Sequence, residues 1–132
     1  AYFTGASNML AGRVLDRQGE FGTVEAGGGH RIAAWLPASV APGQPVKVAV
    51  RPENIRFGLD GGSDGRNRFK ARVLALRYEG VQTVYELEAL GAHIEAIEVG
   101  TSARHPVDAT LDITLPPTLC WAYPAEQDAG LS

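Results

Sequence analysis

The amino-acid sequence predicts an all-β barrel or sandwich with little or no helix, and three observations support this fold class. Short runs alternate apolar and polar residues with a period of two, which is typical of strands that bury one face. Turns rich in Gly and Pro separate these runs at regular intervals. The best helix candidate, residues 35–40, contains Pro37 and is therefore expected to form one turn at most.

The first β half is expected at residues 9–58 and contains four such runs, at residues 10–15, 21–25, 30–36 and 46–50. We expect turns at residues 16–19 and 27–29, because these segments are rich in turn-forming residues. Pro52 follows the fourth run, and since proline lacks an N–H, it ends a central strand or lies at a sheet edge. Ile55 and Phe57 then resume the alternation.

The second β half is expected at residues 69–124, after a glycine-rich linker at residues 59–68. In residues 69–78, the polar Lys70 and Arg72 share their parity with Leu74 and Leu76, which predicts a β-bulge or a strand that changes faces. Further strands are expected at residues 81–89, 93–99 and 111–115. A last apolar face is shared by Leu119, Trp121 and Tyr123. The polar residues 125–132 are expected to form a disordered tail.

The two halves repeat one pattern. The motif Leu10-x-Gly12-x-Val14 opens the first half, and Phe69-x-Ala71-x-Val73 opens the second. The closing strand, proline corner and following strand of the first half, residues 48–57, correspond to residues 113–121 of the second. The sequence therefore predicts two degenerate copies of one β unit.

Composition limits the classes of partner. The 132 residues include 15 acidic and 12 basic side chains, a formal charge of −3, whereas a non-specific nucleic-acid surface needs a basic patch. We therefore expect no nucleic-acid partner. No apolar run approaches the roughly 20 residues that span a bilayer, so membrane contact is expected only through another protein. The chain begins with Ala1 and not with Met, and we expect residues 1–8 to be the tail or linker of a preceding domain.

The sequence contains no pattern that supports catalysis or metal binding. The glycine-rich segments lack the Lys-Ser/Thr of a nucleotide-binding P-loop, and the three histidines have no ligand spacing. Cys120 is the only cysteine, and beside Trp121 it is expected to be a small buried hydrophobe. We therefore expect no enzyme activity, no cofactor and no metal site in this chain. The carboxylates Glu86 and Glu88 alternate with apolar residues and are expected on a solvent face, which we favour over an acid/base pair.

The segment Arg51-Pro52-Glu53-Asn54 allows two interpretations. Arg51 could bind an anion. Alternatively, the segment is a structural corner that Pro52 stiffens, while Arg51 or Glu53 satisfies backbone groups or forms a short ion pair. We favour the structural corner.

Three ordered blocks resemble the TOBE domain, the accessory module of ATP-binding subunits in bacterial ABC importers. The first is the junction Phe3-x-Gly5-x-x-Asn8-x-Leu10-x-Gly12-x-Val14. The second is the strand and corner Val50-Arg51-Pro52-Glu53, and the third is Tyr78-x-Gly80-x-x-x-x-Tyr85. The likeness is greatest to the spermidine/putrescine type, with iron, sulfate and sugar importers as the other solute classes.

The resemblance implies an OB-fold-like, C-terminal regulatory and dimerisation module that is not itself catalytic. ATP and Mg would bind an ATPase domain upstream, and transmembrane permease subunits would be further partners. The protein would then be a homodimer in the cytoplasm, peripheral to the inner membrane. The alternative is an OB-like domain that senses a small ligand, an oxyanion or a polyamine, and inhibits transport when it is occupied. If the ligand is a polyamine, Glu86 and Glu88 are expected to face it.

Overall fold

The computed structural model describes residues 7–58, 67–100 and 105–125, and most of these residues lie in strands. The first part contains β1 (Asn8–Gln18), β2 (Phe21–Ala26), β3 (His30–Trp35), β4 (Pro45–Val50), the 3₁₀ turn η1 (Pro52–Asn54) and β5 (Arg56–Phe57). The second contains β6 (Arg68–Glu79), β7 (Gln82–Ala89), β8 (Ala92–Val99), β9 (Thr110–Thr114), the 3₁₀ turn η2 (Pro117–Leu119) and β10 (Trp121–Pro124). The predicted all-β fold class is confirmed. Within the described ranges, neither of the short helical turns has the length or apolar character needed to cross a membrane.

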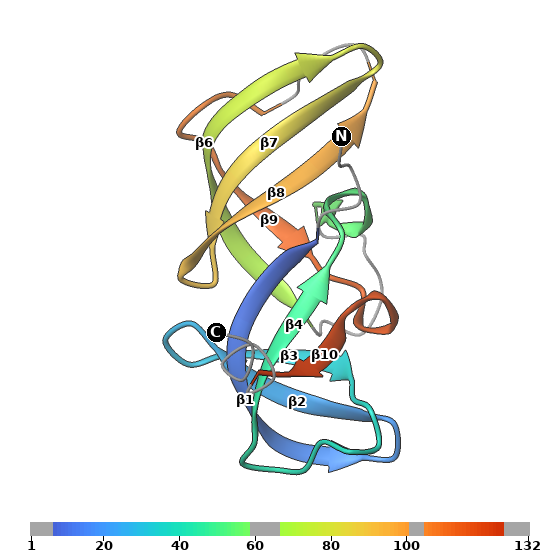
Figure 1. Ribbon diagram of the computed structural model, residues 1–132. Coiled ribbons are helices and arrows are strands. Elements are labelled where there is room, and N and C mark those ends of the chain that lie inside the picture. The colour runs from blue at the N-terminus through green and yellow to red at the C-terminus, as the bar shows by residue number, and fades with distance from the viewer. Residues whose placement is uncertain (1–6, 59–66, 101–104, 126–132) are drawn as a thin grey trace, which may run out of the picture.

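The strands form a closed barrel and a second, five-stranded sheet, which are stacked end to end (Figure 1). The barrel has the order β1-β2-β3-β10-β4, in which β10 pairs with β4 in antiparallel fashion and with β3 in parallel. The second sheet has the order β5-β9-β6-β7-β8, and its neighbouring strands are all antiparallel. The molecule is therefore OB-like, with one closed and one open β unit.

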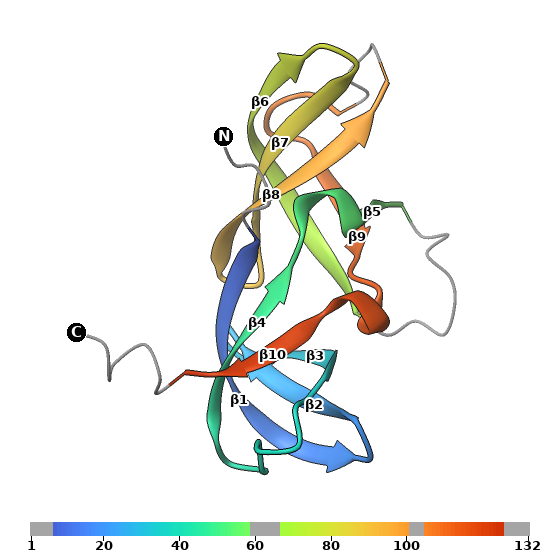
Figure 2. The same ribbon diagram turned by 45° about the vertical axis from the view of Figure 1, so that its right-hand side comes forward.

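Each half of the chain contributes its last strand to the sheet of the other half. β5 follows η1 but pairs with β9 of the second sheet, and β10 follows η2 but closes the barrel between β3 and β4 (Figure 2). The boundaries at residues 9–58 and 69–124 stay a prediction, but the described strands show that the sheets do not follow them. Most of the expected linker, most of the expected tail and residues 1–6 of the expected junction lie outside the described residues.

Both opening strands carry a bulge at the equivalent place. The register of β1 against β2 shifts between Val14 and Asp16, and that of β6 against β7 shifts between Val73 and Ala75. The second shift confirms the bulge predicted for residues 69–78. The turn expected at residues 16–19 lies later in the chain, because residues 16–18 still belong to β1 and pair with residues 21–23 of β2. The chain turns instead after Gln18, where Gly19 has φ +65°.

A single apolar core extends through both sheets. Its largest fully buried side chains are Tyr85, Ile32, Leu36, Leu87, Ile113 and Leu115, which come from both halves. The hairpin turn after β2 also touches the turn after β7, because Gly27 lies so close to the carbonyl oxygen of Leu90 that a Cβ would clash there. The segment expected to form at most one helical turn makes only a turn, in which the N–H of Val40 donates to Pro37 O over 3.1 Å.

Two asparagines join the halves. Asn8 begins β1 and Asn67 precedes β6, each two residues before the opening Leu10 or Phe69 of its half. The side-chain amide of Asn8 donates to Glu95 O and accepts from Glu95 N, both over 2.8 Å. Asn67 pairs in the same way with Ala33, accepting from its N–H over 2.7 Å and donating to its carbonyl over 2.9 Å. Each asparagine therefore satisfies backbone groups of the third strand in the opposite half.

Asn67 is the more deeply buried of the two. Asn67 is only 5% exposed, and its Nδ2 also donates to Leu115 O over 2.8 Å. Its φ of +59° is a conformation that asparagine adopts more readily than most residues. A change at Asn67 would leave buried backbone groups of two segments without partners.

We expect Asn67→Ala to lower the free energy of unfolding by about 3 kcal/mol, because unsatisfied buried groups cost about 1–3 kcal/mol each. Asn67→Gly retains access to the positive φ, so the Gly variant isolates the lost hydrogen bonds from backbone strain. Asn8→Ala should cost less, since Asn8 is partly solvated. Urea denaturation measures all three, and a Gly variant as stable as the parent would contradict this role of Asn67.

Candidate functional site

The segment Arg51-Pro52-Glu53-Asn54 forms a tight corner between β4 and β5. Arg51 is extended (φ −77°, ψ 143°), Pro52 is buried, and the N–H of Asn54 donates to Arg51 O over 2.9 Å. The equivalent corner in the second half has the same hydrogen bond, from the N–H of Leu119 to Pro116 O over 2.9 Å. These bonds are consistent with the structural interpretation, and the anion-binding role of Arg51 stays open.

A groove of about 350 Å³ lies beside this corner. Its lining residues come from both halves of the chain and are Ser7, Ala49, Arg51, Asn54, Leu119, Trp121 and Tyr123. Trp121 and Tyr123 are large aromatic residues that are 42% and 51% exposed. The sequence had predicted that these two aromatic residues share a face, but not that the face adjoins the Arg51 corner. β10 enters the barrel beside β4, the strand that leads into the corner, and Trp121 pairs there with Ala49 and Tyr123 with Lys47. This pairing brings the two aromatic residues next to the Arg51 corner.

The predicted carboxylates Glu86 and Glu88 lie on β7 but take part in different interactions. Glu86 stands opposite Glu95 of β8, and Glu88 stands opposite His93. The Glu88 carboxylate is 3.3 Å from the guanidinium of Arg72, which also binds Asp108. Both glutamate side chains are about half exposed, at 43% and 55%. The solvent-facing position is as expected, whereas their role toward a ligand stays a prediction.

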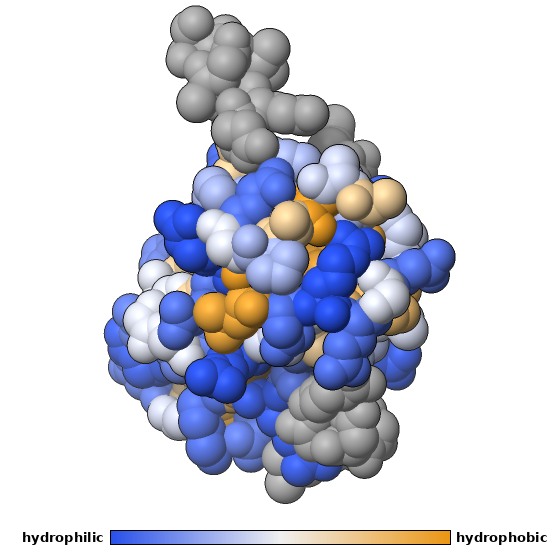
Figure 3. All heavy atoms as spheres, turned by 90° about the horizontal axis from the view of Figure 1, so that it is seen from below, coloured by the Kyte–Doolittle hydropathy of each residue, from blue (hydrophilic) through white to orange (hydrophobic). Residues whose placement is uncertain are grey.

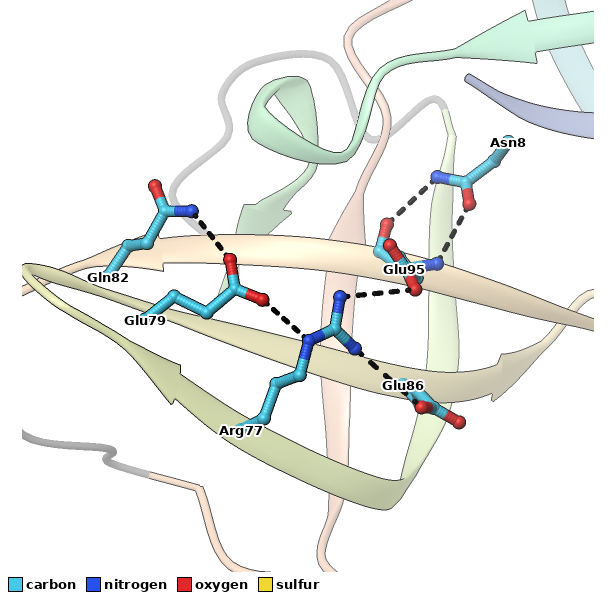
Figure 4. Close-up of polar contacts among 6 residues, drawn as sticks. All are labelled: Asn8, Arg77, Glu79, Gln82, Glu86 and Glu95. Atoms are coloured by element: carbon cyan, nitrogen blue, oxygen red, sulfur yellow. Dashed lines mark hydrogen bonds and ion pairs between the residues drawn. The ribbon is translucent and has the colours of Figure 1, made fainter. Parts of the chain in front are cut away.

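Arg77 lies at the centre of a network of three carboxylates, those of Glu79, Glu86 and Glu95 (Figure 4). Its Nε donates to Glu79 over 2.6 Å, while its terminal nitrogens lie 3.8 Å from Glu86 and 3.7 Å from Glu95. Two like charges directly opposite one another on neighbouring strands are unfavourable, and one guanidinium between Glu86 and Glu95 reduces that repulsion. Asn8 binds the backbone of Glu95 and so ties the network to the start of the barrel.

The network shifts the pKa values of Arg77 and Glu79, the pair with the shortest contact. The hydrogen bond from Arg77 lowers the pKa of Glu79, and the same bond raises the pKa of Arg77. Because the glutamate pKa is lowered, this pair stabilises the fold above the unfolded pKa, and the contribution is lost as the pH falls through the folded value. The contribution of this pair to the free energy of unfolding is small, since the side chains of Arg77 and Glu79 are both about half exposed to solvent.

Sequence analysis missed the partners that complete both sites. The sequence placed no site at Arg77, Glu79 or Glu95, although Arg77 and Glu79 lie next to the turn between β6 and β7. The cluster depends on the register between distant strands. Glu86 pairs with Glu95 on β8 and with Ala75 on β6. Arg77 lies two residues beyond Ala75 and therefore reaches Glu86 diagonally. For the groove, the corner and its aromatic neighbours lie on separate strands, so neither spacing nor periodicity connects them.

Cys120 is buried, as predicted, and burial raises the pKa of its thiol to about 12. Its sulfur lies 3.4 Å from Pro116 O, at the start of η2. Within the described residues, no group of three or more His, Cys, Asp and Glu side chains could hold a metal ion.

Comparisons with known proteins give one family. A family model described as the TOBE domain matches residues 48–122. The chain is 35% identical over 124 residues to the spermidine/putrescine import ATP-binding protein PotA of Rubrobacter xylanophilus, covering 80% of this chain and 32% of the relative. It is 30% identical over 107 residues to the putrescine transport ATP-binding protein PotG of Escherichia coli, covering 80% of this chain and 28% of the relative. The chain thus spans about a third or less of the length of these relatives.

A solved structure shares the fold. The cytoplasmic molybdate-binding protein ModG, crystallised with molybdate bound, superposes with a TM-score of 0.72 at 18% identity. The match covers 90% of this chain and 96% of the ModG chain. At this identity, the likeness concerns the fold alone.

We expect the buried thiol to make the fold alkali-sensitive. An unfolded cysteine ionises near pH 8.5, whereas Cys120 stays protonated to about pH 12 in the fold. Below the pKa of the unfolded thiol, the free energy of unfolding should therefore not depend on Cys120. Above pH 9 it should fall by about 1 kcal/mol per pH unit, because the thiol ionises only in the unfolded chain. Urea denaturation from pH 8 to 11 measures this slope. Cys120→Ala is the control and should be flatter, and equal slopes would contradict the prediction.

Proposed function

The chain belongs to the TOBE domain family, and on this basis we propose that it is a non-catalytic regulatory and dimerisation module of an ABC importer ATP-binding subunit. The observation that carries the proposal is the alignment of 80% of the chain with ATP-binding proteins named for spermidine and putrescine. A polyamine-like solute is accordingly preferred over iron, sulfate or sugar. The parent protein would hydrolyse ATP with Mg in an upstream domain and would act with transmembrane permease subunits at the cytoplasmic side of the inner membrane.

The module would act as a rigid support in this assembly. Strand exchange, a shared core and two asparagine pairs connect its halves, so force applied to one sheet is transmitted to the other. A homodimer would form through exposed β surface. The face viewed from below in Figure 3, at the barrel end of the molecule, is mostly hydrophilic, with hydrophobic side chains in small separate groups. We therefore expect the dimer contact on another face.

An exchange experiment tests the transport role. The segment of the Rubrobacter PotA protein that aligns with this chain is replaced by residues 1–132, and spermidine uptake and ATPase activity are measured beside a variant that lacks the segment. The exchanged protein should retain uptake that the shortened one loses. Sedimentation of the 132-residue chain over a range of concentrations should show a dimer. Uptake no better than that of the shortened protein would refute the transport role, and a strict monomer would refute dimerisation.

The alternative function is a small-ligand sensor that inhibits transport when it is occupied. The observation that favours a polyamine ligand is the excess of carboxylates over cations in the Arg77 network, where Glu79, Glu86 and Glu95 surround one guanidinium. A multiply charged amine would interact with the same oxygens. An oxyanion would need a cationic site instead, and the Arg51 corner is the candidate for it.

Calorimetry with spermidine tests the polyamine sensor. Saturable binding is expected, and Glu86→Gln should weaken it by about threefold to tenfold, with the binding falling further at high salt. Glu25→Gln removes an exposed carboxylate of β2 and should leave binding unchanged. No heat with spermidine, or equal losses in the two variants, would remove this function.

A further inference from the structure

The groove beside the Arg51 corner combines one cationic side chain with two exposed aromatic rings. We propose that it binds a small organic anion that carries a flat ring, with Arg51 and Asn54 at the anionic group and with Trp121 and Tyr123 against the ring. This inference goes beyond the transport role proposed above and does not depend on it.

The aromatic wall is held in place by pairing with its neighbours. Trp121 pairs with Ala49 on one side and with Trp35 on the other, and the two indole rings lie 4.9 Å apart. Ala49 has a small side chain, is 7% exposed and lines the groove beside Trp121. Trp121 nevertheless stays 42% exposed. A flat ligand can therefore contact a ring that is already positioned, which limits the entropy lost on binding.

The charge of the groove selects the ligand. Among the described residues that line it, Arg51 carries the one formal charge, and Ser7 and Asn54 supply neutral hydrogen-bonding groups. A guanidinium presents five N–H donors in a planar fork that suits carboxylate and phosphate. Arg51 also interacts elsewhere in the chain, and the proposal requires only that part of this fork faces the groove. A polyamine would meet like charge here and is disfavoured.

The size of the groove also suits this class. A volume of about 350 Å³ lies at the lower end of the range for small-molecule sites, about 300–1,000 Å³. The lining is mixed, with Ser7, Arg51 and Asn54 as polar residues and with Leu119 and Ala49 as apolar residues beside the rings. A ligand with one or two fused rings would fill the space, whereas a bare oxyanion would leave the aromatic wall unused.

A matched series of ligands tests the charge requirement on the unaltered chain. 1-Naphthoate, 1-naphthamide and 1-naphthylmethylammonium share one ring system and are anionic, neutral and cationic. Calorimetry should show naphthoate binding at least about tenfold more tightly than either of the others. In proton NMR, naphthoate should shift the indole N–H signal of Trp121, which Trp35→Phe identifies. Equal binding of the three ligands, or no saturable binding below about 5 mM naphthoate, would overturn the proposal.

Paired variants test the residues. Arg51→Gln should weaken naphthoate binding by about tenfold or more, while Arg51→Lys should lose less because the charge remains. Arg56→Gln alters an exposed arginine two residues beyond the corner turn and is the matched control. Tyr123→Ala should also weaken binding, whereas Tyr78→Ala, at another exposed tyrosine, should not.

Equal effects of target and control variants would contradict the assignment. If the Arg51 and Tyr123 variants instead change the sedimentation of the chain and leave naphthoate binding intact, the groove is a contact between copies of this protein. That result would overturn the ligand site while leaving the proposed regulatory function standing. Failure of the exchange experiment in PotA would likewise leave the ligand site untouched.

Discussion

The exchange of closing strands is the constraint on which the rest of the structure depends. A barrel must pair the backbone groups of every strand, and the first half lacks the strand that fills the space between β3 and β4. β10 fills it, at the cost of a chain path that crosses from one sheet to the other through the corner at η2. β5 makes the reciprocal crossing through η1. Each half therefore reaches its full set of hydrogen bonds only when the other is folded.

The two asparagines supply hydrogen bonds to backbone groups of β3 and β8, in addition to those that strand pairing provides. β3 meets β10 through one pair, Trp35 with Trp121, and β8 is an edge of the second sheet. Asn67 and Asn8 supply amide groups to these two strands with the geometry of a neighbouring peptide unit. An unpaired backbone group in these positions would destabilise the fold where it is buried. Where it is exposed, it would allow a strand of another chain to pair with this edge. The same residue at the same place in both copies indicates that the need is inherent in this architecture.

The exchange also separates two kinds of surface chemistry. The Arg77 network is built within one hairpin and its neighbouring strand, and carboxylates dominate it. The groove is built across the exchange, and an arginine with aromatic rings dominates it. A single small module thus carries a carboxylate-rich network on one part of its surface and a groove with an arginine and two aromatic rings on another. If both bind, the shared core and the asparagine pairs connect the two sites mechanically.

The sequence by itself determined what depends on neighbouring residues. Alternation fixes strands and their buried faces, the parity break at Lys70 and Leu74 marks the bulge, and the Arg-Pro-Glu corner with two further blocks identifies the family. The repeat was readable too, because both proline corners keep their spacing. Tertiary structure alone decided that the last strands exchange, that Glu86 and Glu88 face different partners, and that the corner adjoins Trp121. Those outcomes rest on hydrogen bonds between strands distant in sequence, and a local pattern carries no information about which distant strand completes a barrel.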